Sequence, residues 1–123
     1  MTNNEFFTTW LKNFASDIDE ENINRYVIGF GECIWHVFSW KLTDEKNYLV
    51  GDTARQTYDK MNKVGAIYID WYEDDNTNYL TQALSTSKAL DDFIEVYVVG
   101  KDFEWTYIKT HEQGLGPYFM FKK

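Results

Sequence analysis

Apolar residues recur with helical spacing at the start of the chain and with strand-like alternation towards its end. A spacing of three to four residues predicts an amphipathic helix at the start, with Asn3 or Asn4 as its cap. Its apolar stripe comprises Phe6, Phe7, Trp10, Leu11, Phe14 and Ile18. An acidic turn at 17–21 follows, and a short second helix is expected from Asn22 to Gly29 or Gly31.

Five segments rich in β-branched and aromatic residues are predicted as strands. They are residues 33–40, 66–72, 93–99, 103–110 and 118–121. Both faces of the first are apolar, which is typical of a central strand. A tight turn at 100–102 predicts a hairpin of the third and fourth strands, and a turn at 114–117 leads to the fifth.

Shorter helices are expected between these strands. Asp52 is the predicted cap of one helix that ends at Gly65, residues 77–84 are expected to be helical, and Ser87 caps a turn through Leu90. This order predicts one α+β domain over residues 1–123. Its sheet is expected to be five-stranded and antiparallel or mixed, with helices packed mainly on one face and a C-terminal three-stranded meander.

The single Cys33 excludes an internal disulfide, and no signal-peptide pattern follows Met1, which together predict a cytoplasmic protein. A net charge of −8 disfavours nucleic acids and anionic membranes as partners. It suits a basic protein partner, although the same charge also serves solubility. Aromatic residues make up 19% of the chain. They either fill a dense core, which is the favoured interpretation, or anchor a partner at an interface.

Strand alternation places Trp105, Tyr107 and His111 on one face, with Glu112 adjacent. His111 either caps its loop through a backbone hydrogen bond or lines a shallow pocket with those two rings. His36 is expected to be a core histidine with one satisfied ring nitrogen. Asp70 lies in a predicted strand, and we expect it to be a polar residue on an exposed face of the sheet or on an edge strand. The candidate binding residues are Trp35, His36, Trp40, Asp70, Trp105, Tyr107, His111 and Glu112.

No metal site, cofactor or catalytic residue is predicted. Cys33 and His36 have ligand-like spacing, but a strand would direct them to opposite faces. Cys33 could form a catalytic dyad with a histidine, or it could be a buried cysteine that acts as a small apolar residue. The second interpretation is preferred. Gly29-Phe-Gly31 lacks the third glycine of a dinucleotide fingerprint and precedes a predicted strand.

Two stretches resemble a family of small uncharacterised proteins from Bacillus and related Firmicutes. They are Trp35-His-Val-Phe-Ser-Trp40 with Gly51-x-x-Ala54-Arg55, and Glu104-Trp-Thr-Tyr-Ile-Lys-Thr-His-Glu112 with Gly116-Pro-Tyr-Phe119. The resemblance spans about 35–119 and implies a bacterial, cytosolic, single-domain protein. The family has no assigned function, so no catalytic residue carries over. In type, but not in motif, the chain is also similar to small acidic immunity proteins that neutralise toxins.

Three functions remain in view. The preferred one is an immunity-like inhibitor or escort of a basic protein, steered by acidic turns at 17–21 and 73–75 and acting as a monomer or homodimer. The second is a small-molecule or enzymatic site that uses Tyr107, His111 and Glu112. The third is a homo-oligomer formed through an exposed sheet edge.

Overall fold

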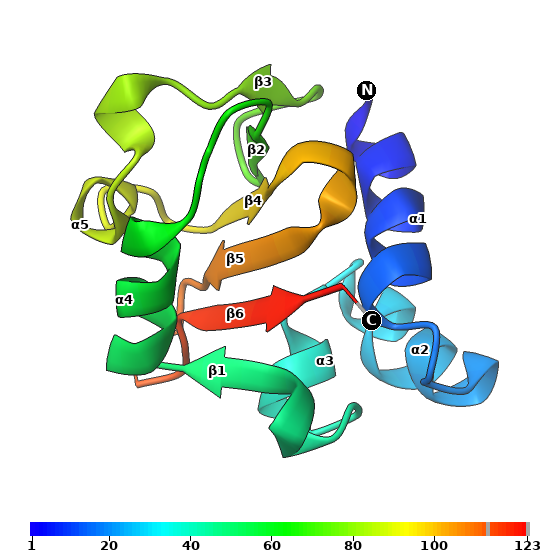
Figure 1. Cartoon of the computed structure of the whole chain (residues 1–123). Helices are drawn as coiled ribbons and strands as arrows, with labels where there is room; N and C mark the ends of the chain where they lie inside the picture. Colours follow the sequence, from blue (N-terminus) through cyan, green and yellow to red (C-terminus); the bar gives the residue numbers. More distant parts are fainter. Residues whose placement is uncertain (113, 123) are drawn as a thin grey trace.

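A single antiparallel sheet forms the centre of the molecule in the computed structural model, which describes residues 1–112 and 114–122. Its six strands lie in the order β1-β6-β5-β4-β2-β3 (Figure 1). The bounds are β1 Tyr48–Val50, β2 Ile67–Asp70, β3 Asn78–Tyr79, β4 Val96–Val99, β5 Trp105–Lys109 and β6 Tyr118–Phe121. The α+β class is therefore confirmed, and the expected count of five strands becomes six.

Five α-helices and several single 3₁₀ turns occur among the described residues. The helices are α1 Asn3–Phe14, α2 Glu20–Tyr26, α3 His36–Ser39, α4 Asp52–Lys60 and α5 Ser87–Leu90. The 3₁₀ turns are η1 Ile28–Phe30, η2 Glu45–Asn47, η3 Gln82–Leu84 and η4 Lys101–Phe103.

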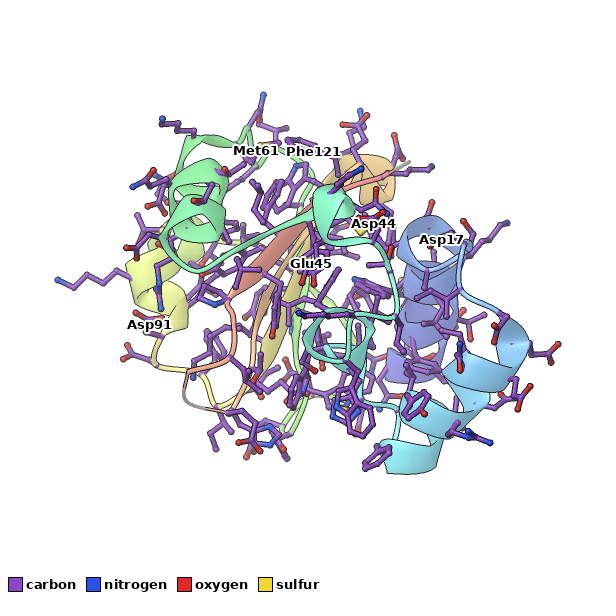
Figure 2. The ribbon with its side chains drawn as sticks, turned by 90° about the horizontal axis from the view of Figure 1, so that it is seen from below. Asp17, Asp44, Glu45, Met61, Asp91 and Phe121 are labelled. Atoms are coloured by element: carbon purple, nitrogen blue, oxygen red, sulfur yellow. The ribbon has the colours of Figure 1, made fainter. Side chains whose placement is uncertain are left out.

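Helices cover both faces of the sheet, so the expectation that they pack mainly on one face is wrong. In Figure 2 the strands run between α4 and α5 on the left and α1 and α2 on the right. Tyr97 and Val99 of β4 enter a core shared with α1 and α3, whereas Val96 and Val98 enter a second core shared with α4 and α5. Because β4 and β5 are apolar on both faces, each face needs a covering layer.

Helix α1 closes the first core, as its apolar stripe predicts. Trp10 is fully buried, and its indole Nε1 donates to Thr106 Oγ1 of β5 at 2.9 Å. The cap is Thr2 and not Asn3 or Asn4. The Thr2 hydroxyl accepts from the backbone N–H of Glu5, and the Glu5 carboxylate accepts from the backbone N–H of Thr2. This reciprocal pair is a capping box, which satisfies two backbone donors at once.

The last three strands pair in chain order, β4 with β5 and β5 with β6, and the hairpin predicted at 100–102 is confirmed. This meander is embedded in a longer sheet, because β1 pairs with β6 and β2 with β4. At the hairpin, a Cβ on Gly100 would lie 2.2 Å from Trp105 Nε1. Only glycine permits this approach of the indole to the backbone.

Two predicted elements are wrong. Residues 33–40 form no strand; they contain α3, and Ile34, Val37 and Phe38 are buried at helical spacing. Residues 77–84 are not a helix, because β3 and a single 3₁₀ turn occupy them. The strand β1 was not predicted, since only three residues of it pair with β6.

Smaller differences concern the helix ends. Gly51 is the cap of α4 and Asp52 its first residue, and the helix ends at Lys60 instead of Gly65. Thr86, not Ser87, caps α5, and its side chain accepts from the backbone N–H of Ala89. Helix ends depend on single hydrogen bonds, so these shifts leave the architecture unchanged.

Candidate functional site: a buried glutamate beside an exposed aromatic patch

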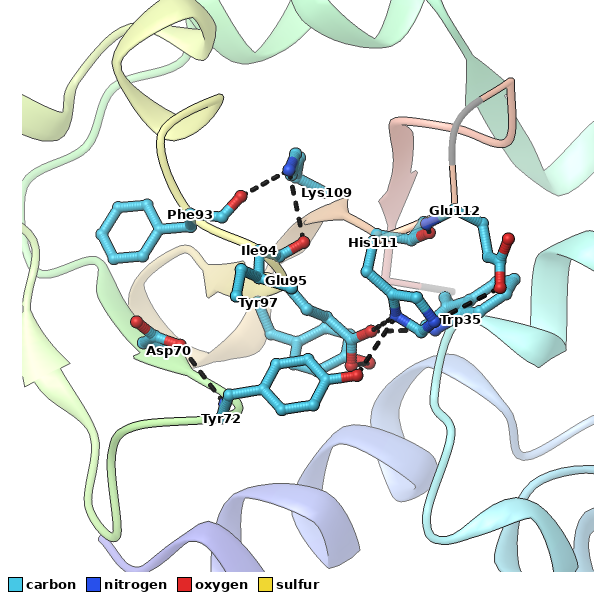
Figure 3. A network of polar contacts seen from close by, with 11 residues as sticks. Trp35, Asp70, Tyr72, Phe93, Ile94, Glu95, Tyr97, Lys109, His111 and Glu112 are labelled. Carbon is cyan, nitrogen blue, oxygen red and sulfur yellow. Dashed lines mark hydrogen bonds and ion pairs between the residues drawn. The ribbon is translucent and has the colours of Figure 1, made fainter.

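Glu95 places a carboxylate inside the molecule, immediately before β4. Its exposed fraction is 2%. One carboxylate oxygen, Oε1, accepts from Trp35 Nε1 at 3.1 Å and faces His111 Nδ1 at 2.8 Å. The other, Oε2, accepts from the Tyr97 hydroxyl at 2.6 Å (Figure 3). Three donors thus compensate for the loss of water around this charge.

His111 lies between two carboxylates at the edge of this network. Its Nδ1 faces buried Glu95, and its Nε2 is 3.3 Å from Oε1 of exposed Glu112. The Tyr72 hydroxyl approaches the same Nδ1 at 3.3 Å. Both ring nitrogens therefore face carboxylate oxygens in this arrangement, and neither points to open space where a third molecule would bind.

A small pocket of about 150 Å³ opens beside the Glu95 carboxylate. It lies where η1, the segment after β2 and the end of β5 meet. Its lining consists of aromatic rings, one acid and polar groups: Phe30, Gly31, Cys33, Trp71, Tyr72, Glu95 and His111. No lysine or arginine is among these lining residues. The lining thus combines the exposed rings of Phe30 and Tyr72 with the buried carboxylate of Glu95.

The charge on Glu95 governs the groups around this pocket. Burial, and then the negative charge of Glu95, raise the pKa of the Cys33 thiol to about 12. The same two causes raise the pKa of the Tyr97 hydroxyl well above its usual value, and they raise that of Tyr72 as well. These three groups therefore remain protonated and neutral at neutral pH, and the pocket has a negative potential.

An exposed group of rings lies next to the pocket. We call Tyr26, Phe30 and Trp40 the aromatic patch. Trp40 lies 4.9 Å from the Tyr26 ring and 5.4 Å from the Phe30 ring, between centroids. Phe30 and Trp40 are 53% and 47% exposed, while His36 beneath them is buried. Phe30 also lines the pocket, so patch and pocket form one continuous surface.

The short elements that present the patch come from one stretch of chain. Tyr26 ends α2, Phe30 ends η1 and Trp40 caps α3. His36 joins them, because its Nδ1 lies 2.7 Å from the carbonyl oxygen of Tyr26 and its ring contacts Phe30 and Trp40. The prediction of a core histidine with one satisfied ring nitrogen is confirmed.

The stretch of chain that presents the patch is rich in acidic residues. Between residues 17 and 46 the chain carries seven acidic and three basic residues. Asp17, at the end of α1, lies beside the segment with Asp44 and Glu45, and the Thr43 hydroxyl donates to Asp17 at 2.9 Å (Figure 2). Two of the three basic residues are paired with acids, Arg25 with Glu21 and Lys41 with Glu45.

Five of the eight predicted binding residues converge here. They are Trp35, His36, Trp40, His111 and Glu112, and the Trp35 ring contacts the rings of both histidines. Trp105 and Tyr107 do not join them, because they lie in the second core on the opposite face. Strand β5 ends at Lys109, so the alternation that was expected to carry His111 to their face does not extend that far.

Asp70 has a local structural role. It accepts from the backbone N–H of Tyr72 at 3.2 Å, and its own N–H donates to Asp74 at 3.0 Å. These bonds shape the turn after β2. Asp70 is thus a turn-forming residue, half-buried and outside the pocket lining.

Glu95 was absent from the sequence prediction, although the site depends on it. Its signal is the single charge in the apolar segment Phe93–Val99. A charge in a buried strand needs partners, which makes it a candidate site residue. Its three partners are Trp35 at the start of α3, Tyr97 in β4 and His111 just after β5. These segments are far apart in sequence, so no local pattern indicates that they meet.

Neither a metal-binding cluster nor a membrane-spanning helix occurs among the described residues. No group of three or more His, Cys, Asp or Glu side chains in 1–112 and 114–122 is arranged to hold a metal ion. In the same part of the chain, no helix has the length and apolar character needed to cross a membrane.

Comparison with known proteins places the chain in a family. A family model described as a domain of unknown function, DUF4275, matches residues 3–119. The match includes α1, which lay outside the resemblance that began at Trp35. No curated protein and no solved structure matches the chain. Because the family model spans nearly the whole sequence, the chain belongs to the DUF4275 family.

Proposed function

We propose that this chain is a cytoplasmic bacterial protein-binding domain that holds a basic protein partner through the aromatic patch, as an immunity protein or antitoxin does. The observation that carries the proposal is the pair of half-exposed rings, Phe30 and Trp40, which contact each other on the surface. Large rings that lie together on the surface leave a contiguous apolar area in contact with water, and such areas are typical of sites that another molecule covers.

The patch has the properties of an interface anchor. Tryptophan and tyrosine dominate binding hot spots, because they bury a large area with few rotatable bonds. Contacts among Tyr26, Phe30 and Trp40 already restrict the rings, so ordering them on binding costs little entropy. His36 packs below as a buried support.

Charge selects the class of partner. The acids at 17–21 and at 44–45 flank the patch residues along the chain, and the Thr43 hydroxyl joins the two acidic segments through its hydrogen bond to Asp17. A basic protein approaching these acids gains from complementary potentials, which increase the association rate. The net charge of −8 acts in the same direction over longer distances.

The geometry gives less support to the enzymatic alternative. Tyr107 lies on the far face of the sheet, away from His111. Both nitrogens of His111 face carboxylates, and the raised pKa of Cys33 keeps that thiol protonated. A thiol nucleophile needs a lowered pKa, so this cluster is poorly arranged for such catalysis.

A capture experiment tests the proposal. Immobilised wild-type protein and the variant Trp40→Ala are incubated with lysate of the source cells, and retained proteins are identified. We expect a protein with a high isoelectric point that the wild type retains and Trp40→Ala loses, since truncating a central anchor typically costs about 2 kcal/mol or more.

The control is Tyr79→Ala, which removes a ring that is 83% exposed and lies on β3. Retention should equal that of the wild type. The proposal fails if Trp40→Ala and Tyr79→Ala retain the same proteins in equal amounts, or if the protein lost with Trp40 is acidic.

A further inference from the structure

We propose that the pocket beside Glu95 receives a lysine or arginine side chain of the basic partner. The inference rests on the proposed function, because it names the group that the partner inserts next to the aromatic patch. Phe30 belongs to both surfaces, so a chain segment lying on the patch can place one side chain in the pocket.

The size of the pocket suits one side chain. Its volume of about 150 Å³ is well below the several hundred Å³ of a typical small-molecule site. It can hold the end of a long side chain but not a nucleotide or sugar. Phe30 and Gly31 are among its lining residues, so a side chain from a segment lying on the patch needs to extend only a short way to reach it.

The chemistry of the lining selects a cation. Phe30, Trp71 and Tyr72 are among the lining residues, and aromatic ring faces attract ammonium and guanidinium groups. Glu95 supplies the negative charge of the lining. Within the part of the chain that the structure describes, its Oε2 accepts one hydrogen bond, from Tyr97, and a carboxylate oxygen can accept two. Figure 3 shows Tyr72 and His111 on either side of this carboxylate.

The charge balance favours the same guest. Among the described residues, the ion partner of Glu95 is His111, and His111 also faces Glu112. Two carboxylates thus share one imidazole, which leaves negative charge in excess at the pocket. A neutral side chain would gain only apolar contacts there, whereas a cation also compensates this excess.

The test uses amino-acid derivatives and needs no partner. Nα-acetyl-lysine amide, Nα-acetyl-arginine amide and the uncharged isostere Nα-acetyl-norleucine amide are titrated into wild-type protein at low salt. The indole N–H signals of Trp35 and Trp105 are followed by NMR. We expect a saturable shift of Trp35 with a cationic derivative, at least tenfold weaker binding of the norleucine derivative, and an unmoved Trp105 on the far face.

Variants identify the contacts. Tyr72→Leu removes an exposed ring of the lining and is expected to weaken the cation's binding about threefold, whereas Tyr79→Leu should leave it unchanged. Glu95→Gln should abolish it; if that variant does not fold, Tyr72→Leu still decides. Equal binding of lysine and norleucine derivatives, no saturable shift, or no effect of Tyr72→Leu overturns the inference.

The two proposals fail separately. If the cationic derivatives bind, but wild type and Trp40→Ala capture the same proteins equally, the cation pocket is supported and the patch is rejected as an anchor. Loss of capture in Trp40→Ala without any binding of the derivatives would retain the protein-binding function and reject the cation pocket.

Discussion

Glu95 holds a carboxylate almost entirely out of water, where an unpaired charge would cost several kcal/mol. Glu95→Leu would leave the buried donors Trp35 Nε1 and the Tyr97 hydroxyl without acceptors. We expect a loss of about 3 kcal/mol in the free energy of unfolding, measured by urea denaturation. Glu112→Gln changes the other carboxylate on His111, which is 52% exposed, and should cost less than about 1 kcal/mol. Equal losses would show that burial does not distinguish them.

Cys33 illustrates how the same carboxylate controls a neighbour. Its pKa rises from an ordinary 9.0 to about 12, and the thiolate is the reactive form. At pH 8 the folded protein should therefore react with an aromatic disulfide reagent about a thousandfold more slowly than the urea-unfolded chain, from the difference in thiolate fraction alone. Comparable rates in the two states would exclude a protonated, shielded thiol.

At the scale of elements, α1 is the segment that the sequence predicts best and that the first core most requires. Trp10→Ala removes a fully buried indole and its hydrogen bond to Thr106. The expected loss in the free energy of unfolding is about 3 to 5 kcal/mol by denaturant titration. Lys12→Ala, on the exposed face of the same helix, should change it by less than about 0.5 kcal/mol. Wild-type stability of Trp10→Ala would mean that α1 does not close the core.

The elements also show where sequence reasoning succeeds. Helix α1 and the β4–β5–β6 strands are predicted because long-range packing agrees with their local periodicity. Residues 33–40 mislead, since β-branched and aromatic side chains favour strands while Ile34, Val37 and Phe38 also fit one turn of helix. Strand β1 is too short to show alternation, and it exists through pairing with β6.

Over the whole molecule, the difficulty lies in contacts between distant segments. The site joins Trp35, Glu95 and His111, which are 60 and 16 residues apart along the chain. Aromatic residues near position 35 and a histidine near the end were expected to matter, but their meeting on Glu95 follows from the sheet order and from the helical layer on that face. Neither is encoded in a local pattern.

The acidic surface has two parts at opposite ends of α1. The turn at 73–75 lies by its start, since Asn3 N–H donates to the Asp75 carbonyl oxygen, and the turn at 17–21 follows its end. A helix of 12 residues separates them by about 18 Å, more than a Debye length at physiological salt. Asp74 also accepts from Asp70 N–H and Asn78, so its replacement would disturb a turn as well as a charge.

We expect the acidic residues to control the association rate of the captured partner and the aromatic patch to control its dissociation rate. Glu20 and Glu32 flank the patch in sequence, and no ion pair engages them within 1–112 and 114–122. Replacing both by Gln should lower the association rate severalfold at low salt, with the dissociation rate and the thermal stability nearly unchanged. Trp40→Ala should instead raise the dissociation rate, because an anchor acts after docking.

Surface plasmon resonance at several salt concentrations measures both constants. The charge-matched control replaces two other exposed acids, Asp52 and Glu104, by Asn and Gln. Asp52 begins α4, which covers the opposite face of the sheet, and Glu104 lies beside Asn62 and Val64 after that helix. Association is compared at physiological salt, where charges farther apart than about 8 Å are largely screened. At that salt the control should associate like the wild type, while the Glu20 and Glu32 variant should remain slower. If both charge variants slow association equally, steering arises from net charge and the acids around the patch have no special part. If neither does, and salt has no effect, the partner is not selected by charge, and the aromatic patch alone must account for its recognition.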